Sequence, residues 1–168
     1  GGMLLNGIEN AICVIPPLYI LLFIVKALMA GACEEIVLRG LFCGNLMRVE
    51  NRENAIFMNT FVPAAVFGLL HLFNLIAGSG LWATISQVLY AFGIGFLFCA
   101  AYMRSGSLLS VIIIHTLVDA CSFIGDALQT GITDKVPVST DTMTPVGYII
   151  QGTVIMSVGL VLGLFLLR

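Results

Sequence analysis

The stretch GACEEIVLRGLF, residues 31–42, places two adjacent glutamates and an arginine in a sequence that is otherwise largely apolar. Of the 168 residues, 60% are hydrophobic and only 10% are charged, and the mean hydropathy is +1.09. A soluble domain is usually about 25% charged, so this composition predicts a polytopic membrane protein. The net charge of −2 and the lack of a basic run exclude a nucleic-acid partner and leave the lipid bilayer as the expected surroundings.

A helix that spans a bilayer needs about 20 mainly apolar residues. Polar and glycine-rich breaks divide the chain into segments of this kind, which predicts an all-α fold, a transmembrane bundle of about six spanning helices in a single domain, residues 1–168. The segments are 8–29, 31–49, 54–75, 81–103, 107–128 and 145–167. Pro16 and Pro17 should kink the first helix or mark its start, and Gly31 should separate it from the second.

Arginines lie at alternate junctions of these segments. They are Arg48, Arg52, Arg104 and Arg168. Alternate junctions of an up-and-down bundle share one side of the membrane, and the positive-inside rule predicts that this side is cytoplasmic. The long connection at 129–144 has only Lys135 as a basic residue, which fits the opposite side.

Few ionisable side chains fall within the predicted spans. They are Glu34, Glu35, Arg39, His71, His115 and Asp119. Each costs at least about 2.5–3.5 kcal/mol at the bilayer centre, so such residues normally face the bundle interior and mark a functional site. These residues lie on three predicted helices, at a similar depth when counted from the arginine-rich ends.

The two glutamates are expected to have different roles. Glu35 and Arg39 are four residues apart and share one helical face, so they can neutralise each other. Glu34 is rotated by about 100° from Glu35, which leaves its carboxylate for proton transfer. The alternative is that all three residues form one structural ion-pair network that fixes helix packing.

Both histidines of the chain lie on apolar segments, in the patterns FGLLH (67–71) and HTLVD (115–119). The ring of Phe67 can pack beside His71 one turn away, and Asp119 shares a helical face with His115. A lone buried histidine is often only a satisfied core residue. Two of them on separate helices, with carboxylates at hand, favour a functional site.

In this order, the three patterns resemble the motifs of the CPBP intramembrane protease family, which includes CAAX prenyl proteases and bacteriocin-processing or immunity proteins. EEIVLR (34–39) is similar to the family's EExxxR, FGLLH to its FxxxH, and HTLVD to its HxxxN or HxxxD. The resemblance covers about 30–125. Family members usually carry further helices before the first motif, so we expect a short member or a trimmed fragment.

The resemblance implies a protease that hydrolyses a membrane-associated peptide or protein, either prenylated or bacteriocin-like. Glu34 would deprotonate a water molecule, His71 would position it, and His115 with Asp119 would face the oxyanion. The family commonly has Asn where this chain has Asp119. An ionised carboxylate would repel an oxyanion, so we expect Asp119 to be protonated, to bind a metal ion, or to orient His115.

The cofactor stays open at this point, either none or one divalent metal ion such as zinc. In a metalloendopeptidase, Glu34, His71, His115 and Asp119 would be the candidate ligands. The chain has no HExxH pattern, so ligand spacing does not decide between the two mechanisms. Two other functions compete with a protease: a transporter with a buried Glu/His relay, which should show paired broken helices, and a catalytically silent membrane scaffold or immunity protein.

Overall fold

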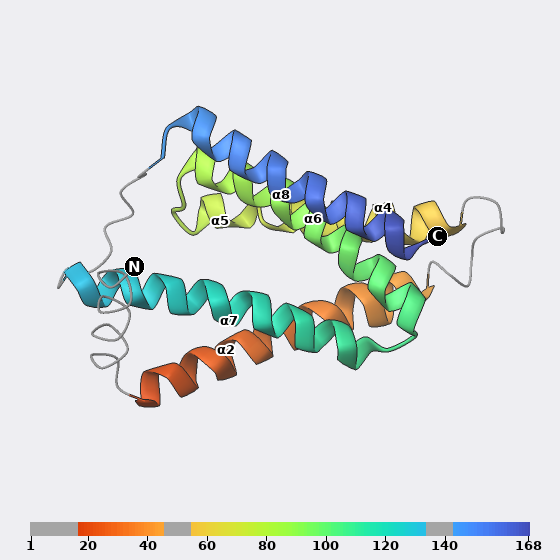
Figure 1. The fold of residues 1–168 in the computed structure, drawn as a ribbon, viewed down its shortest axis with the longest axis horizontal. Helices are drawn as coiled ribbons and strands as arrows, with labels where there is room; N and C mark the ends of the chain where they lie inside the picture. The colour runs from red at the N-terminus through yellow and green to blue at the C-terminus, as the bar shows by residue number, and fades with distance from the viewer. Residues whose placement is uncertain (1–16, 46–54, 134–142) are drawn as a thin grey trace, which may run out of the picture. The chain divides into compact units, whose positions relative to one another are not determined.

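Helices make up all the regular structure that the computed structural model describes, which covers residues 17–45, 55–133 and 143–168 (Figure 1). The elements are α2 (Pro17–Glu35), the π-helix η1 (Ile36–Cys43), α4 (Ala55–Leu70), α5 (Phe73–Ile76), α6 (Leu81–Ser105), α7 (Leu108–Thr133) and α8 (Pro145–Leu166). By length and composition, three described segments can cross a membrane: Met58–Ile76, Leu81–Ser105 and Pro145–Leu166. The prediction of an all-α, multi-pass membrane protein is confirmed.

The later helices begin and end close to the predicted positions because local sequence signals fix their ends. Gly106 ends α6 with a φ of 64°, a left-handed conformation that suits glycine, and its N–H donates to the Tyr102 carbonyl. Thr144 caps α8 by accepting the Gly147 N–H at 3.1 Å, with Pro145 at the first helical turn. Helix ends of this kind can be recognised in the sequence because they depend on neighbouring residues and not on tertiary contacts.

The predicted break at Gly31 is wrong. α2 continues through Gly31 to Glu35 and passes directly into η1. A Cβ atom at Gly31 would lie 3.2 Å from the backbone N and the Oγ1 of Thr116 on α7. The glycine therefore serves a close helix–helix contact, which is a common use of small residues in membrane helices.

Other predicted features lie outside the described residues. These are positions 8–16 of the first predicted helix, positions 46–49 of the second, Arg48, Arg52, and most of the connection at 129–144.

The chain divides into two compact units. The first comprises residues 1–34 and 112–138, and the second comprises 35–111 and 139–168. One division falls between Glu34 and Glu35, inside the EEIVLR motif at 34–39. The expectation of a single domain over 1–168 stays a prediction.

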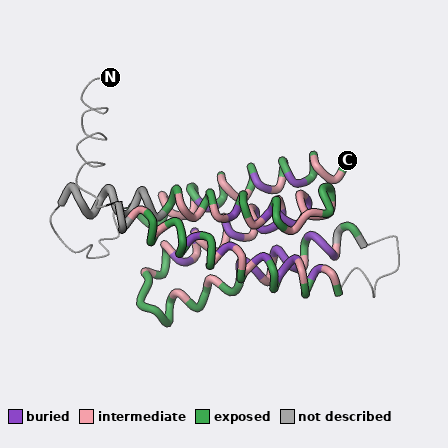
Figure 2. Tube along the Cα trace, turned by 90° about the horizontal axis from the view of Figure 1, so that it is seen from below, coloured by how far each residue is buried: buried purple, intermediate pink, exposed green. Residues whose placement is uncertain are grey.

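In the first unit, α2 and α7 run in opposite directions (Figure 1). In the second unit, α6 is the central helix and contacts η1, α4, α5 and α8. Buried positions recur along the inner sides of these helices, and exposed positions alternate with them (Figure 2). Fully or almost fully buried α6 residues include Ala91, Phe98 and Cys99.

α6 and α8 approach each other through glycines. A Cβ atom at Gly152 would lie 2.8 Å from the Ser86 carbonyl oxygen, and one at Gly159 would collide with the backbone of Gly93. Contacts thus advance along both helices in the same direction, so α6 and α8 are parallel. Arg104, in the last turn of α6, and Arg168, after α8, consequently lie at the same end of this helix pair.

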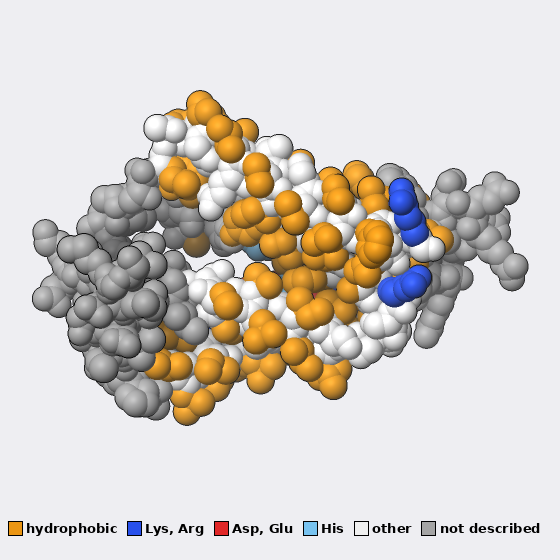
Figure 3. Space-filling view, in the orientation of Figure 1, with side chains coloured by type: hydrophobic (Ala, Val, Ile, Leu, Met, Phe, Trp, Pro, Cys, Tyr) orange, Lys and Arg blue, Asp and Glu red, His pale blue; other side chains and the backbone are white. Residues whose placement is uncertain are grey.

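The outward faces of the helices are apolar. On α8, for example, Val146, Val154 and Phe165 are 67%, 55% and 72% exposed. Hydrophobic side chains dominate the described surface on the face drawn in Figure 3. Exposed apolar surface on this scale is expected of helices that face lipid.

Candidate active site

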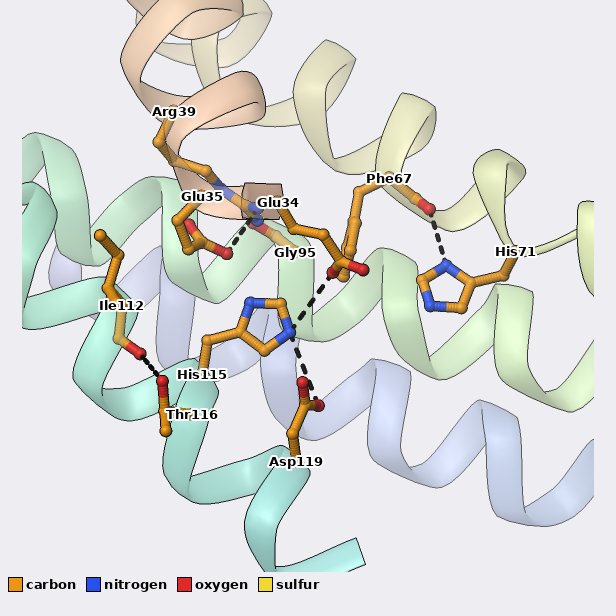
Figure 4. A network of polar contacts seen from close by, with 10 residues as sticks. All are labelled: Glu34, Glu35, Arg39, Phe67, His71, Gly95, Ile112, His115, Thr116 and Asp119. Carbon is orange, nitrogen blue, oxygen red and sulfur yellow. Dashed lines mark hydrogen bonds and ion pairs between the residues drawn. The ribbon is translucent and has the colours of Figure 1, made fainter. Parts of the chain in front are cut away.

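Three of the predicted catalytic side chains meet within the first unit. Nε2 of His115 lies 3.6 Å from Oε2 of Glu34 and 3.7 Å from Oδ1 of Asp119 (Figure 4). The His115 side chain is 6% exposed, whereas those of Glu34 and Asp119 are 43% and 25% exposed. The imidazole is therefore almost fully buried, whereas the two carboxylates are partly exposed.

The meeting of these groups follows from the packing of two helices. Gly31 and Glu34 are three residues apart on α2 and share a face. A Cβ atom at Gly31 would lie 3.5 Å from the Cβ of His115, so the bare glycine lets α7 approach one turn before Glu34. On α7, the Thr116 hydroxyl faces Gly31 and donates to the Ile112 carbonyl at 2.7 Å, so this polar group at the contact is hydrogen-bonded within its own helix.

The geometry of His115 limits its chemistry. The separations of 3.6 and 3.7 Å exceed the 2.7–3.2 Å of a direct N–H···O bond. Long contacts of this kind are common in catalytic groups before substrate binds. Because ionised carboxylates only accept hydrogen bonds, an Nε2 atom that faces two of them is best matched by a proton on that nitrogen. His115 is thus arranged as a hydrogen-bond donor.

The same arrangement bears on whether His115 could be a metal ligand. A histidine ligates a metal through an unprotonated ring nitrogen, so a ligand role would need the opposite state of Nε2. Among the described side chains, no group of three His, Cys, Asp or Glu residues could hold a metal ion. Within the first unit, Glu34, His115 and Asp119 as placed do not fit a metal site, and we derive no catalytic step through one.

The predicted pairing of Glu35 with Arg39 is confirmed, and it belongs to the second unit. Nη1 of Arg39 donates to Oε1 of Glu35 at 2.9 Å, and both side chains are 0% exposed. Nη2 of Arg39 donates to the carbonyl oxygen of Gly95 on α6, also at 2.9 Å. The two adjacent glutamates therefore have separate partners, as the helical rotation between them predicts.

Arg39 is also enclosed by aromatic rings. Its guanidinium carbon lies 5.1 Å from the ring centroid of Phe67 and 5.6 Å from that of Phe98, within the range of cation–π attraction. The residue sits in η1, and π-helical turns are frequent at functional sites. The 3.6-residue periodicity used on the sequence does not reveal such a segment.

His71 lies where α4 ends, and the end of the helix fixes its side chain. Its backbone N–H donates to the Gly68 carbonyl at 3.1 Å, a tighter turn than the α-helical one, which leaves the Phe67 carbonyl to the side chain. Nδ1 of His71 lies 2.9 Å from that carbonyl oxygen (Figure 4). A carbonyl only accepts, so Nδ1 carries the proton, and Nε2 of a neutral ring is an acceptor.

The predicted packing of Phe67 beside His71 is confirmed as well. Their ring centroids are 4.9 Å apart and the rings are nearly perpendicular, at 87°. His71 belongs to the second unit, so its convergence with Glu34 and His115 stays a prediction. So do the catalytic roles assigned to these residues.

Two positions near the candidate site escaped the sequence reasoning. The sequence pattern predicts a break at Gly31, where α2 in fact continues, and it does not distinguish Gly95 from its neighbours. Glycine within an apolar helix is the signal that could have identified both, because it often marks close helix packing in membranes. Asn74, on α5 after His71, donates to Gln87 of α6 at 2.7 Å and ties the end of the α4–α5 segment to α6.

These features define a class, a multi-pass membrane protein with a carboxylate–imidazole–carboxylate cluster suited to proton transfer. Residues 16–121 match the family model described as type II CAAX prenyl endopeptidase Rce1-like. The match covers more than half of the 168 residues and includes every candidate site residue, so the chain belongs to this family. The resemblance drawn from the three motifs is confirmed. No curated protein and no solved structure matches the chain.

Proposed function

We propose that the chain is an intramembrane endopeptidase in which Glu34 activates the water that attacks the peptide carbonyl. Membership of the Rce1-like family implies protease activity. The single observation that supports the assignment of roles is the cluster in which Glu34 and Asp119 flank Nε2 of His115 at 3.6 and 3.7 Å. Glu34 takes a proton from the water molecule while the water oxygen attacks the peptide carbonyl carbon. Glu34 then returns that proton to the amine nitrogen as the C–N bond breaks.

His115 is proposed as the donor to the oxyanion. Its Nε2 faces acceptors in the resting site, and the same N–H can donate to the charge that develops on the carbonyl oxygen. Asp119 orients the imidazole from one turn away, with Oδ1 at 3.7 Å from Nε2. This role needs neither a metal ion nor an amide at position 119, and it accounts for the departure from the family's commoner Asn.

His71 is proposed to position the attacking water. Because Nδ1 is engaged by the Phe67 carbonyl, Nε2 is left as the acceptor that can orient a water hydrogen. The proposal requires Nε2 of His71 and the carboxylate of Glu34 to reach the same water molecule in the working enzyme.

The substrate is proposed to be a peptide with a prenylated cysteine near its C-terminus, cleaved close to the membrane surface. The family's name supports this class, and a prenyl chain partitions into lipid beside apolar helices. A bacteriocin-like peptide is the alternative. Arg104 and Arg168 lie at one end of the α6–α8 pair, and the positive-inside rule supports a cytoplasmic position for that end.

The test is cleavage of a farnesylated peptide ending in the CAAX pattern by the purified chain in detergent. Glu34→Ala and His71→Ala are expected to abolish turnover while the protein stays folded. Cys33→Ser is the matched control, since Cys33 is the exposed neighbour of Glu34 and would be the competing nucleophile. Turnover that survives Glu34→Ala but not Cys33→Ser would replace the water mechanism with a thiolate one. A folded wild-type protein that cleaves neither prenylated nor bacteriocin-like peptides would favour the silent scaffold.

A further inference from the structure

Gly95 of α6 lies where the first two motifs meet within the second unit. Its carbonyl oxygen accepts from Nη2 of Arg39 at 2.9 Å. A Cβ atom at this position would lie 2.9 Å from Cδ1 of Phe67 and 3.3 Å from Cα of Ala64. Real Cβ atoms essentially never approach a ring carbon so closely, and Phe67 is itself only 4% exposed. The Phe67 ring thus occupies the space that a side chain at position 95 would fill.

Phe67 in turn holds His71 in two ways. The edge of one ring meets the face of the other at a centroid separation of 4.9 Å, and the Phe67 carbonyl accepts from Nδ1 of His71 at 2.9 Å. The first contact sets the plane of the imidazole, and the second sets which ring nitrogen carries the proton. A shift of the Phe67 ring therefore alters both the position of His71 and the hydrogen bond that fixes its tautomer.

We infer that Gly95 is a positioning residue for His71, which it controls through the Phe67 ring. It is required as glycine because a side chain here would displace that ring, and its carbonyl accepts from Arg39, whose guanidinium lies over the same ring. The consequence for catalysis rests on the proposed role of His71. The consequence for the geometry of the His71 ring does not.

Gly163 provides a matched control within the same unit. A Cβ atom at Gly163 on α8 would lie 2.6 Å from Cδ1 and 2.9 Å from Cε1 of Phe96, so alanine there also presses on a buried phenylalanine. Phe96 has no contact with His71 among the described ring pairs and hydrogen bonds. Gly95→Ala and Gly163→Ala therefore create similar steric clashes with a buried phenylalanine, but only Phe67, at the first position, contacts His71.

The experiment uses the full chain in detergent with ¹⁵N-labelled histidine. The sequence has only two histidines, so the ring signals can be assigned with one variant, His115→Gln. Three quantities are compared for wild type, Gly95→Ala and Gly163→Ala: the ¹⁵N shifts of the His71 ring, kcat and KM for the farnesylated peptide, and the unfolding midpoint.

Gly95→Ala is expected to move the His71 ring signals and to lower kcat at least about tenfold, with KM within about twofold, because a misplacement near 1 Å can cost up to about 10²-fold in rate. Gly163→Ala is expected to lower the unfolding midpoint while the His71 signals and kcat per folded molecule stay as in wild type. Unmoved His71 signals in folded Gly95→Ala, or equal movement in Gly163→Ala, would overturn the inference.

A second variant keeps the test decisive where Gly95→Ala unfolds. Phe67→Leu removes the ring edge, so Gly95→Ala should lower the unfolding midpoint less in the Phe67→Leu protein than in wild type. An equal decrease in both proteins would show that the Phe67 ring is not the group that the alanine displaces. If the His71 signals move in Gly95→Ala, but kcat is unchanged both in that variant and in His71→Gln, the positioning by Gly95 is supported and the proposed role of His71 is refuted. The two failures are thus distinguishable.

Discussion

Replacing Arg39 by methionine should cost the fold about 3–5 kcal/mol, which is the usual effect of removing one partner of a buried ion pair. Arg39→Met removes the positive charge that pairs with the carboxylate of Glu35, at a position that is 0% exposed. The change also removes the donor to the Gly95 carbonyl and the cation over Phe67, but methionine retains most of the apolar stem. The loss of charge balance is therefore the largest expected contribution to the lower free energy of unfolding.

The double variant Glu35→Leu/Arg39→Met separates charge balance from packing. Apolar replacement of a whole buried ion pair is often neutral or stabilising by about 1–4 kcal/mol, so the double variant should recover most of the loss seen in Arg39→Met. The assay is the free energy of unfolding of the four proteins of the cycle, measured by denaturant titration in detergent. If the double variant loses as much free energy of unfolding as the two single variants lose together, the view that Glu35 and Arg39 act as one neutralised pair is refuted.

Three further changes test other parts of the account. Gly31→Ala brings a methyl group to about 3.2 Å from Thr116. Turnover, measured as kcat, should fall, whereas the free energy of unfolding should change little, because the helix preference of alanine, about 1 kcal/mol better than glycine, offsets the close contact. Asp119→Asn should retain turnover, and a chelator should affect neither it nor wild type, whereas a chelator-sensitive rate restored by added metal would overturn the metal-free route. Gly159→Leu should unfold the α6–α8 pair, while Val158→Leu on the exposed face should leave the unfolding midpoint unchanged.

Much of the fold could be predicted from the sequence because lipid and turn chemistry act locally. The ends of α6 and α8 follow from Gly106 and Thr144, whose roles depend on a few neighbouring residues. The reading of Gly31 failed for the opposite reason. Glycine weakens an isolated helix, but here the close approach of Thr116 on a helix far along the chain makes it favourable.

The candidate site shows the same contrast. Helical rotation predicts that Glu34 and Glu35 face different partners, and four-residue spacing predicts that Phe67 packs on His71. The hydrogen bond from His71 Nδ1 to the Phe67 carbonyl could not be predicted, because it depends on α4 ending in a tighter turn. The part played by Gly95 was equally hidden, since it depends on which helix packs against α4.

The adjacent glutamates offer the most direct test of the account, which assigns chemistry to Glu34 and structure to Glu35. The measurement compares Glu34→Gln and Glu35→Gln for turnover of the farnesylated peptide and for the free energy of unfolding. Glu34→Gln should lower turnover by about 10²–10⁴-fold, the usual worth of a general base, with stability unchanged. Glu35→Gln should retain measurable turnover but lose about 2–3 kcal/mol of stability, because an amide hydrogen-bonds Arg39 without balancing its buried charge. Full turnover in folded Glu34→Gln, or an unaltered fold with abolished turnover in Glu35→Gln, would contradict the account.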